Sequence, residues 1–198
     1  MNINIHQEIT KTAVDSNNLI MHILTKYNCY SAENYELAFI ALVKGSILPD
    51  SNLQKWRATA GWHGIRVGNT KMNNILKNQA IKAARLLING EIALAFTELG
   101  MALHTLQDST AHFTLWRQLG IRWNAHKLEY DLLTWDYRGK WVTENVEATI
   151  MGNNRAKLAL ELSKEYLSDF IKIPFTKNGT PKAPKYKHNS SSFKEKLK

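Results

Sequence analysis

Apolar residues recur at helical intervals through most of this chain, and no run shows the strict alternation typical of a strand. The pattern predicts helices at 6–27, 31–43, 71–88, 91–115 and 123–135, and a last helical range at 142–171 that can break at 152–154. Ser31 has the position of an N-cap, and Asn89-Gly90 has that of a helix end. The sequence therefore predicts an all-α protein of five to seven helices, with a single compact multi-helix domain at residues 1–173.

The basic charge of the chain is concentrated at its carboxyl end. The net charge is +9, and residues 172–198 contribute eight lysines and one acid to it, so the preceding residues are almost neutral. Periodicity is also lost after Pro174, which predicts a basic, flexible tail at 174–198. Such a tail is either simply solvated or contacts an anionic membrane surface or a nucleic acid.

Composition excludes several classes of protein. An apolar content of 44% and an aromatic content of 10% are typical of a globular chain, not a disordered one. No run approaches the ~18 apolar residues of a membrane span, and the start of the chain lacks the pattern of a signal peptide. We therefore expect either a cytoplasmic protein, export by a signal-independent route, or a leader already removed. Cys29 is the single cysteine, so no intramolecular disulfide can form.

The stretch LGMALHTLQDSTAHFTLW, residues 99–116, places two histidines and an aspartate at four-residue intervals. His104, Asp108 and His112 would span only ~80° of a helix surface that is otherwise apolar. Polar groups in such a position need partners, and a metal ion would supply them. His104 and Asp108 can share one cation, whereas His112, ~12 Å from His104, suits a neighbouring one. The alternative, histidines that are satisfied by hydrogen bonds in the core, stays open.

Further candidate ligands lie outside this stretch. His6 begins the first helix, Asp50 follows a proline in ILPD, and His63 stands in GWHG within an irregular segment. His126 opens the helix that follows the motif. His22 is interpreted instead as a partly buried core histidine.

Taken in chain order, these candidates are His6, Asp50, His63, His104, Asp108, His112 and His126. Their order and types resemble the zinc-dependent phospholipase C and single-strand-specific nuclease superfamily, including the phospholipase C-like domains of bacterial polymorphic toxins. The resemblance runs from about residue 6 to residue 131. It implies an all-α fold with clustered zinc ions.

The resemblance also implies how the ligands are shared. The first zinc would take His63, His104 and Asp108, with Asp50 beside it. Asp108 would bridge to a second ion held by His6 and the N-terminal residue. The third ion would take His112, His126 and a carboxylate one helical turn further on.

The last carboxylate departs from the family pattern. The family has an acid four residues after the final histidine, but this chain has Tyr130 at that position. Glu129 can share the face of His126 on a helix and is the preferred ligand. Asp131 and Asp136 are the remaining choices.

The amino end departs as well. Members of the family begin with a tryptophan whose backbone binds zinc, whereas this chain begins with Met1. Of the three ions, the one near His6 is therefore the least expected. Without it, the site would hold two metals, and His6 would form a hydrogen bond beside them. We expect two or three zinc ions.

The implied activity is hydrolysis of a phosphodiester by water that the zinc ions activate, with Asp50 orienting or deprotonating this water. Trp62 is the candidate for contact with substrate, because an aromatic side chain beside the metals could stack a base or enter a lipid interface.

Three functions remain in view. The leading one is a phospholipase C-like enzyme acting on phospholipid, for which the motif resemblance suggests the role of a bacterial toxin or effector. The second is a single-strand nuclease or 3'-nucleotidase with the same metals. The third, from another class, is a non-catalytic metal-stabilised binding module. Mixed histidine and aspartate ligands favour an open catalytic zinc site, since structural zinc sites are usually closed and rich in cysteine.

Overall fold

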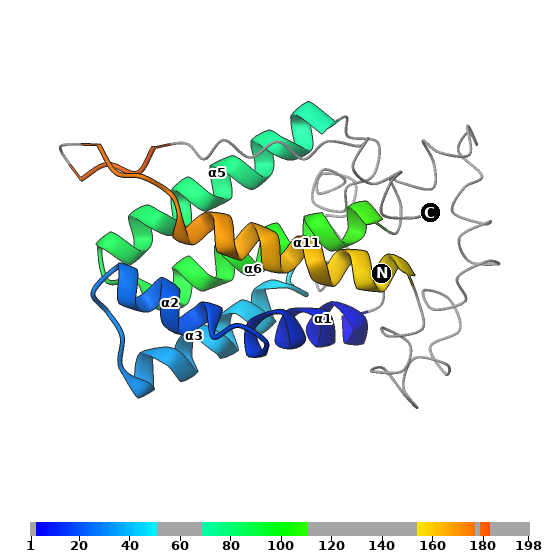
Figure 1. Ribbon diagram of the computed structural model, residues 1–198, viewed down its shortest axis with the longest axis horizontal. Helices are drawn as coiled ribbons and strands as arrows, with labels where there is room; N and C mark the ends of the chain where they lie inside the picture. Colours follow the sequence, from blue (N-terminus) through cyan, green and yellow to red (C-terminus); the bar gives the residue numbers. More distant parts are fainter. Residues whose placement is uncertain (1–2, 51–68, 111–153, 177–178, 183–198) are drawn as a thin grey trace.

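α6 (Ile92–Asp108) is the helix around which the others pack in this computed structural model. The structure describes residues 3–50, 69–110, 154–176 and 179–182, and statements about the fold refer to these ranges. The other helices within them are α1 (Ile3–Asp15), α2 (Leu19–Lys26), α3 (Ala32–Gly45), α5 (Asn69–Ile88) and α11 (Asn154–Ile171). α3 and α5 make the largest contacts with α6, and α11 packs on both α6 and α1 (Figure 1). The prediction of an all-α class is confirmed for the described residues.

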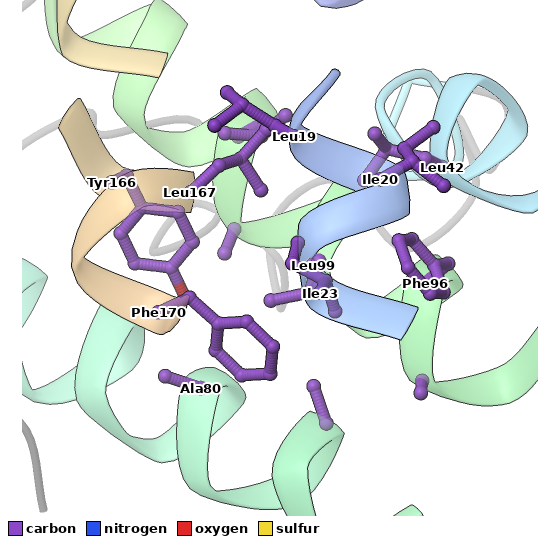
Figure 2. Packing of buried hydrophobic residues seen from close by; sticks show 14 of the residues in the cluster. Leu19, Ile20, Ile23, Leu42, Ala80, Phe96, Leu99, Tyr166, Leu167 and Phe170 are labelled. Atoms are coloured by element: carbon purple, nitrogen blue, oxygen red, sulfur yellow. The ribbon is translucent and has the colours of Figure 1, made fainter. Parts of the chain in front are cut away.

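The core is formed where α2, α3, α5, α6 and α11 meet (Figure 2). Leu167 and Phe170 of α11 are buried in one cluster with Ile23 of α2 and Leu99 of α6. Complete burial of an apolar side chain of this size stabilises the fold by about 1.5–3 kcal/mol. These contacts place α6, with His104 and Asp108 near its carboxyl end, in the middle of the bundle.

The predicted continuous helix at 6–27 is wrong. α1 ends at Asp15 and α2 begins at Leu19, with Asn18 between them in the left-handed conformation at φ 50°. Serine and asparagine side chains compete with helical hydrogen bonds, and asparagine tolerates positive φ better than most residues. The polar sequence Ser16-Asn17-Asn18 therefore divides the two helices, although the apolar periodicity continues across it.

The other predicted boundaries are closer to the structure. The Ser31 side chain accepts a hydrogen bond from the backbone N–H of Asn34 at 3.0 Å, as expected for an N-cap. Gly90, at φ 78°, separates α5 from α6 as the Asn89-Gly90 pair predicted. α6 ends at Asp108 and passes into a wider, π-type turn at residues 109–110. The predicted helix at 123–135, and the predicted helical residues 111–115 and 142–153, lie outside the described residues.

The segment after Ile173 keeps structure where a flexible tail was predicted to begin. Phe175 and Pro181 form an antiparallel bridge, and the N–H of Lys182 donates to the carbonyl of Pro174 at 2.8 Å. Lys26 fixes the start of this hairpin, because its ammonium group donates to the carbonyl of Ile173 at 2.6 Å. The start of this segment is thus held at the carboxyl end of α2. A basic tail at 183–198 stays a prediction.

Two glycines allow α3 and α6 to approach closely. A Cβ atom on Gly100 would lie 2.8 Å from the Cα of Gly45, so neither position has room for a side chain. Among the described residues, no helix has both the length and the apolar character needed to cross a membrane.

Candidate metal centre

The amino end of α1 and the carboxyl end of α6 lie at the same end of the bundle (Figure 1). His6 belongs to the first of these, and His104 and Asp108 belong to the second, one helical turn apart. All three side chains are buried. One ligand atom from each lies within 4.8 Å of the other two, which forms a group that could hold a metal ion.

The Asp108 carboxylate faces the Nε2 atoms of both imidazoles. Its Oδ1 is 3.2 Å from Nε2 of His6, and its Oδ2 is 3.2 Å from Nε2 of His104. The two imidazole rings are stacked, with centroids 4.2 Å apart and planes inclined by 29°. Each carboxylate oxygen therefore faces a different histidine, and both Nε2 atoms point toward the same small volume.

Asp50 adds a second carboxylate to this group. It follows α3 in a turn in which its N–H donates to the carbonyl of Ile47 at 3.1 Å. Its two oxygens lie 3.8 Å from Nε2 of His6 and 3.8 Å from Nε2 of His104. The Asp50 side chain is 20% exposed, whereas that of Asp108 is 1% exposed. Of these two carboxylates, Asp50 is the one that solvent reaches.

Both histidines are oriented through Nδ1. Nδ1 of His104 donates to the backbone carbonyl of Ser46 at 2.9 Å, and Nδ1 of His6 donates to Oε1 of Gln107 at 2.6 Å. A histidine that donates from Nδ1 to an oxygen presents the Nε2 lone pair, which is the usual arrangement for histidines that bind metal. Nε2 of His6 is buried and has no hydrogen-bond partner among the described residues. A cation beside Nε2 would satisfy this atom.

The pKa values of the two histidines are shifted in opposite directions. Burial, followed by repulsion from His104, lowers the pKa of His6. For His104 too, burial is the largest single effect, and alone it would lower the pKa. However, the charge and hydrogen bond of Asp108, then Asp50 and Ser46, together outweigh burial and raise the pKa of His104. His6 is therefore neutral near pH 7, whereas the carboxylates favour the protonated form of His104.

The donor set fits a divalent metal. Two imidazole nitrogens and one or two carboxylate oxygens are ligands that zinc accepts in catalytic sites, and other transition metals share them. The buried Nε2 of His6 and the adjoining carboxylates supply both a lone pair and compensating negative charge. The described residues therefore fit one divalent ion, with His6 and His104 in the same group, whereas the resemblance implied separate ions for them. The further zinc ions that the resemblance implies would need predicted ligands that lie outside the described residues.

Four of the predicted site residues come together, namely His6, Asp50, His104 and Asp108. Five others, Trp62, His63, His112, His126 and Glu129, lie outside the described residues, so their roles stay predictions. His22 was interpreted as a partly buried core histidine, and this was wrong, because its side chain is exposed on α2.

Several residues that support the site could not be found by sequence reasoning. Gln107 and Ser46 accept the Nδ1 protons, and Gln107 is itself held by Thr10 and Ser163. These partners are 56 to 101 residues apart along the chain, so no local spacing could have linked them. The one local signal for Gln107 was its position directly before Asp108 on a helix expected to be buried.

Comparison of the chain with protein-family models, with curated proteins and with solved structures gave no match. The function proposed below therefore depends on the residues and their geometry.

Proposed function

We propose that this chain is a zinc-dependent phosphodiesterase of the phospholipase C type. The observation that carries the proposal is the buried group of His6, His104 and Asp108, with Asp50 beside it at the solvent side. Structural zinc sites are closed and rich in cysteine, whereas this group offers nitrogen and carboxylate ligands next to a partly exposed acid.

The chain's own residues divide into two roles. His6, His104 and Asp108 would hold the metal, because their ligand atoms converge and the two Nδ1 atoms are already engaged with Gln107 and Ser46. Bound zinc would supply Lewis-acid polarisation of the phosphate ester and lower the pKa of water.

Asp50 has the second role. Its carboxylate lies 3.8 Å from both Nε2 atoms, and it is more exposed than Asp108. It can therefore orient a water molecule at the open side of the site and accept its proton. A positioned general base of this kind typically contributes about 10²–10⁴-fold to the rate.

The test begins with the metal content of protein purified without chelator, measured as zinc per chain. We expect two or three ions, as the sequence resemblance implies, and zero ions after reconstitution with zinc would overturn the proposal. The zinc-loaded protein is then assayed on phosphatidylcholine vesicles for release of phosphorylated headgroup and on single-stranded DNA for cleavage.

Headgroup release that disappears with chelator and returns with zinc supports the phospholipase C assignment. Cleavage of DNA alone would replace it with the nuclease assignment. Zinc binding without either activity would indicate a non-catalytic metal-stabilised module and overturn the enzyme proposal.

A further inference from the structure

Gln107 connects the candidate metal centre to the middle of α11. Gln107 directly precedes Asp108 on α6, and its side chain is buried between α1 and α11. Oε1 of Gln107 faces Nδ1 of His6 at 2.6 Å. Its Nε2 faces the hydroxyl oxygens of Thr10 at 3.1 Å and Ser163 at 3.2 Å.

The orientation of the Gln107 amide follows from Ser163. The Ser163 hydroxyl donates its one hydrogen to the carbonyl of Ala159 at 2.7 Å, so its oxygen can act toward Gln107 as an acceptor. The group of Gln107 that faces Ser163 must then be the donor, which is the NH₂. Because the amide is planar, its oxygen is directed at His6.

The same reasoning fixes the proton on His6. An amide oxygen only accepts, so Nδ1 of His6 must carry the hydrogen in the bond with Gln107. A neutral imidazole has one N–H, and in the neutral form of His6 this hydrogen is the one on Nδ1. Nε2 of His6 therefore has a lone pair, and it lies 3.2 Å from Oδ1 of Asp108.

We propose that Gln107 is a positioning residue that selects the Nδ1–H tautomer of His6 and so prepares Nε2 of His6 as a metal ligand. The chain of donors and acceptors runs from the Ala159 carbonyl through Ser163, Gln107 and His6 to the centre. The Ser46 backbone carbonyl accepts the Nδ1 hydrogen of His104 in the same way. Gln107 differs from Ser46 because its side chain, not its backbone, accepts the hydrogen. A substitution at position 107 can therefore remove the acceptor. The consequence for metal affinity rests on the proposed function, whereas the tautomer does not.

The test measures the tautomer of His6 in metal-free protein by ¹⁵N NMR at mildly alkaline pH, where pyrrole-type and pyridine-type nitrogens are distinguished. We expect a pure Nδ1–H tautomer in the unmodified chain. Gln107→Leu removes the acceptor and should give a mixture or the Nε2–H form. Gln107→Glu keeps an acceptor for Nδ1 and should keep the Nδ1–H tautomer.

Zinc affinity is measured on the same proteins by titration calorimetry. Loss of a residue that orients a ligand typically weakens metal binding by about 10–100-fold, so we expect this loss in Gln107→Leu and substantial recovery in Gln107→Glu. Gln79→Leu is the matched control, because Gln79 is a similarly buried glutamine on α5, a helix that contributes none of the four residues of the centre. It should change neither the tautomer nor the affinity.

Two outcomes would overturn the inference. One is an Nε2–H tautomer in the unmodified protein, and the other is a pure Nδ1–H tautomer in folded Gln107→Leu. If Gln107→Leu does not fold, Ser163→Ala replaces it. That variant removes one of the two acceptors of the Gln107 amide and should broaden the tautomer distribution, and an unchanged distribution would count against the inference. If zinc fails to bind the unmodified protein, the proposed function fails, and the tautomer measurements still decide the role of Gln107.

Discussion

Gly45 and Gly100 lie against each other where α3 crosses α6, and a Cβ on Gly100 would come within 2.3 Å of the carbonyl oxygen of Leu42. Gly45 directly precedes Ser46, and Gly100 lies one helical turn before His104. It therefore determines how closely the Ser46 carbonyl approaches Nδ1 of His104, at 2.9 Å. Close packing of two helices at small residues thus sets the geometry of one proposed ligand.

Gly100→Ala should both destabilise the protein and weaken zinc binding. The added methyl group would meet backbone atoms of α3, which cannot move aside as a flexible side chain can. Overpacking of this kind costs typically about 1–3 kcal/mol, and separation of the helices would lengthen the bond between Ser46 and His104. Chemical denaturation gives the free energy of unfolding, and calorimetry gives the zinc affinity.

Gly90→Ala is the control for that substitution. Gly90 has φ 78°, and no atom lies within 4 Å of the position that a Cβ would take there, so the cost is backbone strain alone, about 1–2 kcal/mol. Zinc affinity should be unchanged. Equal zinc affinities in unmodified protein and Gly100→Ala would show that the helix crossing does not control the site.

Asp108→Asn should prevent metal binding at the proposed centre and abolish the proposed phosphodiesterase activity, while the helical content is maintained. The carboxylate serves both histidines, at 3.2 Å from each Nε2, and an amide cannot supply its charge. We expect zinc affinity to fall by at least about 100-fold, the upper end of what loss of a supporting residue costs. Elemental analysis, activity and circular dichroism are measured together.

Asp169→Asn provides the comparison for Asp108→Asn. Asp169 is 49% exposed and pairs with Lys172 on the surface, so zinc content and activity should be unaffected. Full zinc content and activity in Asp108→Asn would remove the basis of the proposed function.

The helical class and the central pair of candidate ligands could be predicted because both patterns are local. Helix periodicity repeats every few residues, and His104 and Asp108 are one turn apart on the same helix. The break at Asn18 was missed because apolar spacing continues through it, while the polar run 16–18 ends the helix by backbone competition.

The meeting of His6 with Asp108 and the supporting bonds depend on tertiary packing. Gln107 and His6 are 101 residues apart, and Ser46 and His104 are 58 apart. Nothing in the spacing of single residues specifies which helix faces will meet. The residue types at His6 and Asp50 made them candidates, and the bundle geometry brings them within 4 Å of the other candidate ligands.

Asp50→Asn should separate catalysis from metal binding. If Asp50 positions and deprotonates water, kcat falls by about 10²–10⁴-fold while zinc content stays the same. Asp15→Asn, at an exposed position at the end of α1, is the control and should leave both quantities unchanged. A parallel loss of zinc and activity in Asp50→Asn would make Asp50 a metal ligand instead of a general base.

Tyr27→Phe should leave the protein as stable at neutral pH and make it more stable in alkali. The Tyr27 hydroxyl is buried with no hydrogen-bond partner among the described residues, so its removal costs no bond. Its ring is retained in the contacts with Phe170 and Phe175, whose centroids lie 5.9 Å and 5.6 Å away. By contrast, the Tyr166 hydroxyl donates to the carbonyl of Leu76 at 2.9 Å, so Tyr166→Phe should cost about 1 kcal/mol.

The alkaline effect follows from the pKa of Tyr27, which burial, and then the charge of Cys29, raises above its usual value of 10.0. Below pH 10 both folded and unfolded chains keep the phenol proton. Above pH 10 the unfolded chain releases it while the folded chain retains it, so the free energy of unfolding falls by at most about 1.4 kcal/mol per pH unit from this group. Denaturation curves from pH 9 to pH 11 should show a shallower decline for Tyr27→Phe than for the exposed control Tyr30→Phe. Equal slopes for the two variants would mean that the Tyr27 hydroxyl is solvated in the folded protein.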